Sequence, residues 1–357
     1  MIQFNKLLPL LFCAAILNAE DKRMSSFDKR LSALEAQPQV EKRYNPPEFL
    51  TYGFQFSADA LYWQARENGT AYALKNYLGS DGIHSQKQDM KNLSFDWDFG
   101  FRIGAAYIFP RDRWLLSSQW THFDTKAKDL GHGPTPDLFI PIWSNPDFAP
   151  DLLLPSRAKA RWHLNLNQID VMLSRPFHVS KYLVLNPEIG PSGLWLKQHY
   201  RLKYRRLRID PGHSHVRMTD EFSAIGLRAG LDTRFGFPGG WGIFNETAFT
   251  LYYGEFQLHR KETYTLALPP RSELGDSIRK TWRGVAPVLQ LALGIRYDHP
   301  FNNDSMAVTF KLAWETAIYF SQNQFLRFVN PNIGNSIVPT QGDITLCGGT
   351  FSAGFVF

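Results

Sequence analysis

Two features are scarce in this 357-residue sequence, namely cysteine and long apolar runs. Beyond the N-terminal segment, no uninterrupted apolar stretch approaches the roughly 20 residues that a transmembrane helix needs, which excludes an α-helical membrane protein. The sequence holds 2 cysteines, Cys13 and Cys347. If Cys13 is removed with an N-terminal leader, Cys347 is left alone. No internal disulfide can then form, even in an oxidising compartment.

The N-terminal segment predicts export. Lys6 precedes an apolar run from Leu7 to Leu17, and Ala19 is a small residue before charged ones, a pattern typical of a signal peptide over residues 1–19. Residues 20–48 follow as a predicted periplasmic segment with a short amphipathic helix and a proline-containing linker. That helix could be a short coiled coil that joins a homotrimer, or a loosely ordered arm.

The C-terminal segment alternates between two kinds of side chain. Thr350, Ser352 and Gly354 share one parity, and the other parity carries the aromatics Phe351, Phe355 and Phe357. Aromatics toward lipid and small or polar residues toward a lumen are what a strand of a membrane barrel requires. The carboxyl-terminal phenylalanine resembles the insertion signal that outer-membrane barrels present to the barrel-assembly machinery.

The same period of two recurs along the chain and predicts the fold class. Short and long connections alternate between the predicted strands, as in bacterial outer-membrane barrels. We therefore expect an all-β, transmembrane antiparallel β-barrel over residues 49–357, with about ten strands and room in the loops for up to sixteen. Trp97, Tyr107, Trp114 and Tyr319 are expected in the aromatic girdles. The predicted strands cover residues 50–64, 95–109, 113–127, 158–175, 182–204, 220–235, 241–257, 284–299, 305–320 and 347–357.

Two stretches resemble a known family. One runs from Trp97 through Gly104 and continues to Trp114 and the segment 120–123; the other runs from Leu164 to Asp170 and continues through Arg175-Pro176-Phe177 to Tyr182, Pro187 and Gly190. Together they are similar to the Legionella-type major outer membrane protein family, which includes barrel proteins of Chlamydia-like bacteria. The resemblance implies an outer-membrane barrel with porin and surface-antigen roles. Cysteine-rich members form disulfide-linked envelope networks, a role that a lone Cys347 does not support.

Charged residues of both signs fall on the parity that faces the predicted lumen. In a wide barrel they would line a water-filled channel and set its ion preference, and in a narrow barrel they would pair across the lumen and close it. Mixed signs suit a narrow lumen, since unpaired buried charges are costly. These residues are Asp59, Arg102, Arg228, Asp232, Glu246, Arg296, Lys311 and Glu315.

A basic row alternates with apolar residues near the extracellular end of the predicted strand 182–204. Lys197, Arg201, Lys203 and Arg205 form it, with His199 between them. The row could draw anionic solutes or bind lipopolysaccharide phosphates, or it could be a solvated strand edge. The formal net charge is +6. In an exported protein this charge favours lipid, lipopolysaccharide or host-surface glycans as partners over nucleic acid.

The predicted loop between residues 128 and 157 is unusually apolar for an exposed loop. Its stretch from Leu138 to Trp143 contains one proline and five apolar residues. We expect it to fold into the barrel; packing against another subunit and a hidden hairpin are the alternatives.

The sequence favours an outer-membrane porin that needs no cofactor. A closed-lumen adhesin or structural surface antigen is the alternative of a different class. A protease acting at the barrel rim is a third possibility, since His122 and Asp124 share a face and His213 and His215 lie in the next long loop. No serine or metal signature accompanies them, and two histidines are not a metal site, so we predict no enzyme activity.

Overall fold

The computed structural model describes residues 53–78, 84–132, 138–145, 155–205, 212–266, 273–301, 306–329 and 336–357. The predicted signal peptide and periplasmic segment, residues 1–48, lie outside the described residues. Among the residues that the structure describes, no helix has the length and the apolar character needed to cross a lipid bilayer.

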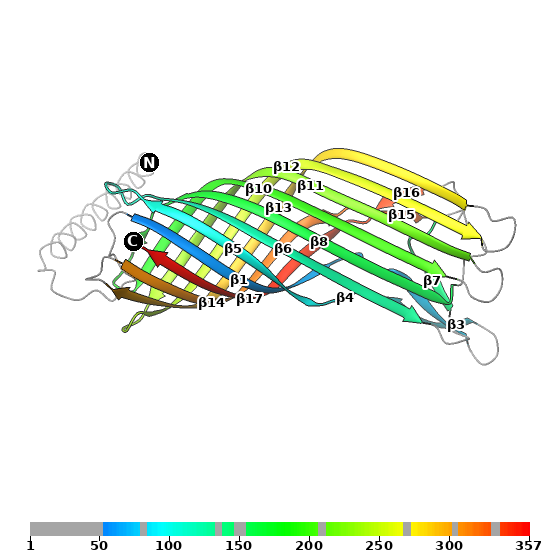
Figure 1. Ribbon diagram of the computed structural model, residues 1–357, viewed down its shortest axis with the longest axis horizontal. Coiled ribbons are helices and arrows are strands. Elements are labelled where there is room, and N and C mark those ends of the chain that lie inside the picture. The colour runs from blue at the N-terminus through cyan, green and yellow to red at the C-terminus, as the bar shows by residue number, and fades with distance from the viewer. Residues whose placement is uncertain are drawn as a thin grey trace, which may run out of the picture. The chain divides into compact units, whose positions relative to one another are not determined.

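Ten long antiparallel strands form a closed barrel, which confirms the predicted fold class and the strand number. Each strand pairs with its neighbour in the chain, and the last pairs with the first. Figure 1 shows the strands tilted across the long axis of the barrel. Their bounds are β1 Gly53–Glu67, β5 Trp97–Ile108, β6 Leu115–His132, β8 Arg157–Ser174, β10 Leu183–Arg205, β11 Gly212–Gly236, β12 Trp241–Leu266, β13 Glu273–Phe301, β14 Met306–Asn323 and β17 Gly342–Val356.

The two ends of the barrel differ. At one end, called here the turn end, the chain reverses tightly: Phe237 N donates to Trp241 O across a turn in which Gly239 and Gly240 have positive φ values of 89° and 86°. The C-terminus lies at this end (Figure 1), where Phe54 and Phe357 exchange two backbone hydrogen bonds of 2.9 and 3.0 Å. Short turns face the periplasm in bacterial outer-membrane barrels, so the opposite end, the loop end, is extracellular.

Short strands accompany the barrel. Three of them form one small sheet, β3–β2–β7, and two form a hairpin, β15–β16; both lie at the loop end in Figure 1. The other two pair with barrel strands, β4 with β6 and β9 with β10. Their bounds are β2 Ala73–Leu78, β3 His84–Lys91, β4 Ser94–Phe95, β7 Leu138–Pro141, β9 Phe177–His178, β15 Leu326–Val329 and β16 Ser336–Pro339.

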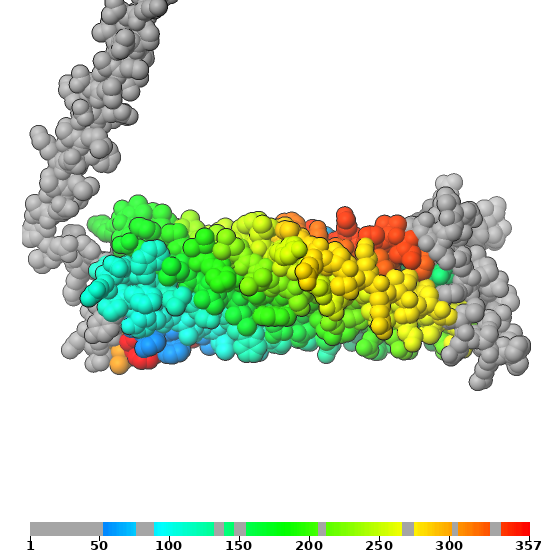
Figure 2. Space-filling view, turned by 90° about the horizontal axis from the view of Figure 1, so that it is seen from above, coloured from blue at the N-terminus to red at the C-terminus, as the bar shows by residue number. Residues whose placement is uncertain are grey.

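The turn-end half of the barrel carries its apolar side chains on the outside. On β5, Trp97, Phe99, Phe101 and Ile103 are exposed, while Asp98, Gly100, Arg102 and Gly104 alternate with them and face inward. The other barrel strands show the same pattern, and together they form a belt suited to lipid contact. In Figure 2 the described residues form an elongated cylinder.

The loop-end half is built the other way round, with its apolar side chains inside. Every barrel strand except β5 contributes fully buried inward side chains to one cluster, which we call the apolar plug. On β5 the corresponding position is Gly100, where a Cβ would lie 2.8 Å from Cδ2 of Phe123. Large members of the plug are Trp63, Phe123, Trp143, Trp162, Tyr200, Tyr204, Phe222, Tyr252, Phe256, Tyr319 and Phe325.

The burial of Tyr319 corrects one expectation. We predicted this residue in an aromatic girdle, but it is only 1% exposed and its hydroxyl donates to Gln168 Oε1 at 3.0 Å inside the barrel. The reason is parity: on β14 Phe310, Leu312 and Trp314 face outward, so an odd-numbered residue faces inward.

The barrel is longer than a membrane requires. Strand β12 has 26 residues and β13 has 29. At about 3.4 Å per residue and a tilt of 35–45°, 26 residues rise roughly 60–70 Å along the axis, whereas the lipid-facing band of such barrels is about 25 Å tall. The loop-end half therefore projects beyond the membrane, where an apolar interior and a polar exterior are the ordinary arrangement for water.

Candidate functional site

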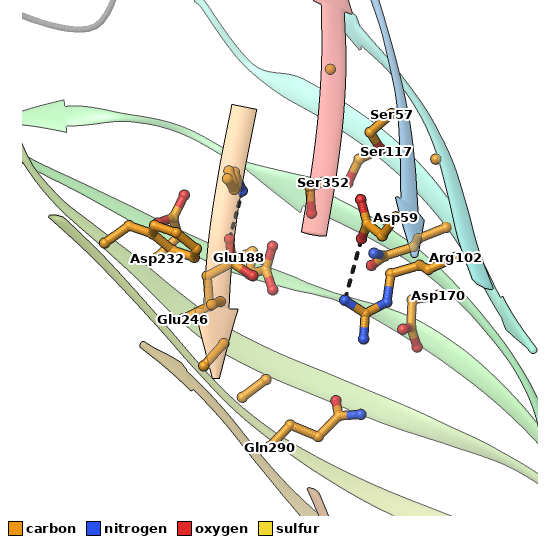
Figure 3. A pocket seen from close by; sticks show the side chains of 18 of the residues that line it. Ser57, Asp59, Arg102, Ser117, Asp170, Glu188, Asp232, Glu246, Gln290 and Ser352 are labelled. Carbon is orange, nitrogen blue, oxygen red and sulfur yellow. Dashed lines mark hydrogen bonds and ion pairs between the residues drawn. The ribbon is translucent and has the colours of Figure 1, made fainter. Parts of the chain in front are cut away.

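The turn-end half encloses a polar cavity of about 290 Å³, called here the vestibule. All eight charged residues that the sequence analysis assigned to the lumen line it: Asp59, Arg102, Arg228, Asp232, Glu246, Arg296, Lys311 and Glu315. In Figure 3, Asp59, Arg102 and Asp170 gather on one side of the cavity and Glu188, Asp232 and Glu246 on the other.

Arg102 is the centre of the first group. Its guanidinium donates to both carboxylate oxygens of Glu315, at 3.0 and 2.9 Å, and lies 3.4 Å from Asp59 Oδ2 (Figure 3). Its Nε donates to Thr121 Oγ1 at 3.1 Å, and the guanidinium lies over the Trp63 ring, 5.5 Å from the ring centroid. A bidentate pair of this kind fixes the guanidinium in one orientation.

The other cations of the vestibule also have acidic partners. Lys311 Nζ lies 2.8 Å from Glu246 Oε1, and Arg296 Nε donates to Asp298 Oδ2 at 2.8 Å. Arg228 lies 3.9 Å from both Asp170 and Glu188. The vestibule is therefore close to charge-balanced, with each cation held against a carboxylate.

Sequence reasoning missed three charged residues of this cavity. Asp170, Glu188 and Arg234 line it as well, and Arg234 Nε donates to Asp232 Oδ2 at 2.6 Å. Arg234 shares the parity of Arg228 and Asp232, so extending the strand alternation to the turn end would have found it. Asp170 shares the parity of the buried Leu164 and Leu166 on β8, and parity would have found it too.

A layer of hydrogen-bonded side chains separates the vestibule from the apolar plug. Gln168 Nε2 donates to Asp170 at 2.9 Å, and Gln168 Oε1 accepts from Tyr319. Ser192 bonds both Asp170 and Tyr252. Beyond this layer, toward the loop end, the apolar side chains of the plug fill the described interior.

An inward-folded segment reinforces the plug at the loop end. In the described part of the apolar loop, residues 138–145, Phe139 is 0% and Trp143 1% exposed. Trp143 Nε1 donates to Ala71 O at 2.7 Å, and Trp143 O accepts from Arg260 Nη2 at 2.9 Å. This part of the loop folds into the barrel, as the sequence suggested.

Arg260 holds that loop through an ion network in which Arg260 and Glu262 are fully buried and Asp276 is partly buried. Its Nη1 lies 2.7 Å from Asp276 Oδ1 and its Nη2 lies 2.6 Å from Glu262 Oε2. Glu262 in turn accepts hydrogen bonds from Ser144 Oγ at 2.6 Å and from Asn145 N at 2.9 Å. The network ties β12 and β13 to the loop across the interior.

The predicted basic row lies on the outer surface of the loop-end half. Arg201, Lys203 and Arg205 are exposed, whereas the residues between them, Leu202 and Tyr204, belong to the plug. Lys197 Nζ is paired with Glu221 Oε1 at 2.5 Å. The row therefore faces the extracellular surroundings of the barrel, and not its lumen.

Cations on the neighbouring strands lie opposite the basic row, so that a second row of cations runs across the barrel wall. Arg201 lies directly opposite Arg161 on β8 and Arg217 on β11. Arg161 lies opposite Lys128 on β6, and Arg217 opposite Lys261 on β12. We call these five exposed residues the cation row. The next positions toward the loop end add Lys159, Lys203, Arg157 and Arg205.

The cation row influences the histidines beside it. His215 lies opposite Lys203 and Thr263, and burial together with Arg217, Lys203, Arg201 and His213 lowers its pKa to about 4. His199 lies opposite His163 and Thr219; burial, Lys197, His163 and Arg201 lower its pKa, against a smaller opposite effect of Glu221. Burial is the largest cause of both shifts, and the neighbouring cations add to it.

The histidines considered for hydrolysis lie on the outer wall and apart from the vestibule. His122 Nδ1 lies 2.9 Å from Asn167 Oδ1, and Asp124 pairs with His163 Nε2 at 2.8 Å. His213 and His215 are on β11, outside the cation row. Among the described residues, no group of three or more histidine, cysteine or acidic side chains could hold a metal ion.

The remaining predicted residues lie on the barrel wall. Phe351, Phe355 and Phe357 are exposed on the lipid side, and the rings of Phe355 and Phe357 are 5.5 Å apart. Cys347 is a free cysteine on the same strand, between Gln64 of β1 and Thr316 of β14.

Comparison with known protein families gives a match over residues 47–357, to the family described as Legionella pneumophila major outer membrane protein precursor. The chain belongs to this family. As a member of the family with a closed ten-stranded barrel, it is an outer-membrane protein.

Solved structures of several outer-membrane barrels are similar to this member of the Legionella family. The Escherichia coli outer membrane protease OmpT has 10% identity and a TM-score of 0.34, with 87% of this chain and 99% of that chain covered. The Pseudomonas putida toluene transporter TodX has 7% identity and a TM-score of 0.29, with 85% and 89% covered. A search of curated proteins gave no match.

Proposed function

We propose that this protein is a closed-lumen outer-membrane barrel whose function lies on its extracellular wall, as an attachment or surface-display protein. The observation that supports this most is the apolar plug. Side chains such as Trp63, Phe123 and Tyr252 are 0–3% exposed and belong to one buried cluster inside the barrel. A solute would have to displace them, and interiors packed in this way do not open without a large cost in buried area.

A second candidate is the porin, and the vestibule favours it. A cavity of about 290 Å³ lined by ion pairs is the kind of lumen that carries water and small ions. A channel would require the segment 138–145 and the aromatic side chains of the plug to move aside together. The buried network around Arg260 opposes that movement.

Single-channel recording separates the two candidates. We expect the purified protein in planar bilayers to give no stable conductance steps, while a known trimeric porin in the same bilayers does. The control variant is Lys311→Glu, which reverses a charge in the vestibule. Stable steps whose ion selectivity changes in Lys311→Glu would contradict the closed lumen and establish the porin.

A further inference from the structure

Beside the plug, the outer wall presents the cation row, which consists of Lys128, Arg161, Arg201, Arg217 and Lys261. Their register places each directly opposite the next on five neighbouring strands, β6, β8, β10, β11 and β12. Like charges directly opposite each other destabilise a sheet. A row of five cations therefore costs folding stability unless something outside the chain neutralises it.

Carboxylates near the row are already engaged elsewhere. On the outer face of these strands Asp124 pairs with His163, Glu221 with Lys197, and Glu255 with Arg283. Within the described part of the chain, none of the five cations of the row has a carboxylate within ion-pair distance. The row keeps its full charge.

The height of the cation row above the membrane indicates whether lipid phosphates could be the anion that neutralises it. Arg161 lies eight residues beyond the exposed apolar Ile169 on β8, and Arg201 lies six residues beyond the exposed Trp195 on β10. Six to eight residues rise roughly 15–20 Å at about 3.3 Å per residue and a tilt of about 40°. The headgroup layer is only about 5–8 Å thick on each side, so the row stands clear of lipid phosphates.

The length of the cation row indicates the size of the ligand that could contact all five cations. Neighbouring strands lie about 4.8 Å apart, so five rungs span roughly 20 Å. A single phosphate meets one or two of these cations, whereas an extended chain with closely spaced charges meets all five. Arginine and lysine at the surface bind such chains through released counterions.

We propose that the cation row binds an extended polyanionic saccharide, a sulfated glycan, lying across β6 to β12 outside the headgroup layer. This inference rests on the proposed surface-attachment role and names its ligand class. Arg161 and Arg201 are central, because each has a cation directly opposite it on both neighbouring strands.

The test uses the full chain in lipopolysaccharide-free nanodiscs and a fluorescent heparin-derived octasaccharide as the probe. We expect binding that weakens steeply with added salt. The variant Arg161→Gln/Arg201→Gln should lose roughly tenfold or more in affinity. The matched control is Arg111→Gln/Lys181→Gln, which removes the same charge from exposed positions at the turn end. It should bind as the wild type does.

Three outcomes would overturn the proposal. The first is equal octasaccharide affinity in the two double variants. The second is a loss of affinity for lipopolysaccharide-containing vesicles that matches or exceeds the loss for the octasaccharide, since this would point to a lipid source. The third is equally tight binding of hyaluronan fragments, whose charges are sparse. Conductance is a separate measurement that tests the closed lumen and not the ligand. Channel steps would refute the closed lumen, whereas the octasaccharide result would stand.

Discussion

At the residue scale, position on the wall decides what a charged side chain does. Arg102 and Arg260 both face inward and are held by carboxylates in fixed geometry. Arg201 and Arg217 face outward with like charges beside them. The first pair organises the interior. The second pair adds to the effect of burial, which is the largest cause of the lowered pKa values of His215 and His199.

Those histidines predict how glycan binding depends on pH. Burial is the largest cause of the lowered pKa of His215, about 4 instead of 6.5, and Arg217, Lys203 and Arg201 add to it. A bound polyanion offsets the part that these cations cause, so the pKa rises on binding and protons are taken up. Affinity for the octasaccharide should therefore increase as the pH falls from about 6.5 toward 4. Titration calorimetry in two buffers of different ionisation enthalpy measures the uptake. The variant His199→Gln/His215→Gln should show a flatter profile; an unchanged profile would contradict the assignment.

At the element scale, each long strand changes its polarity part-way along. On β10, Trp195 is exposed toward the membrane, while Leu202 and Tyr204 nearer the loop end are buried inside. The inward parity is the same throughout, and only the kind of residue on it changes. One strand thus serves as a membrane strand in its first half and as a strand of a water-soluble barrel in its second.

The stability of the loop-end half depends on the segment 138–145, which is folded into it and held by Arg260. Arg260→Met should leave the fully buried Glu262 and the partly buried Asp276 without their cation, at a cost of about 3–5 kcal/mol. Hydrogen exchange of residues 142–145 should then accelerate strongly, because Arg260 no longer holds Trp143 O. In Arg260→Met/Glu262→Gln one of the stranded charges is gone, and part of the stability should return. Exchange rates that stay at wild-type values in Arg260→Met would show that the network does not hold the loop.

At the scale of the whole molecule, closure depends on the seam between β1 and β17. The terminal residue completes it, since Phe357 and Phe54 bond to each other through their backbones. The rings of Phe56 and Phe357 stack on the lipid side, with their centroids 6.0 Å apart. The seam therefore joins the two ends of the barrel sequence and carries the predicted insertion signal.

A substitution at Phe357 can test the role of this residue in insertion separately from its role in barrel stability. Phe357→Ser keeps the backbone bonds of the seam and removes only an exposed ring, so spontaneous refolding into detergent should change little. Insertion in cells should fall several-fold if the barrel-assembly machinery reads this ring. Heat-modifiable mobility on gels measures both, with Phe351→Leu as the control that keeps an apolar residue. If Phe357→Ser inserted as well as the wild type, the ring of Phe357 would not be part of the insertion signal.

The sequence by itself determined the barrel, its ten strands and the inward parity, because backbone pairing in a membrane and alternation along a strand are local constraints. Parity also found the vestibule charges around Arg102 and Lys311. Only the tertiary structure decided that apolar side chains fill the loop-end interior and that five cations align across the wall. Which side chains meet inside the barrel, and which stand opposite each other outside it, depends on the register between strands far apart in the chain, and alternation within one strand carries no information about that register.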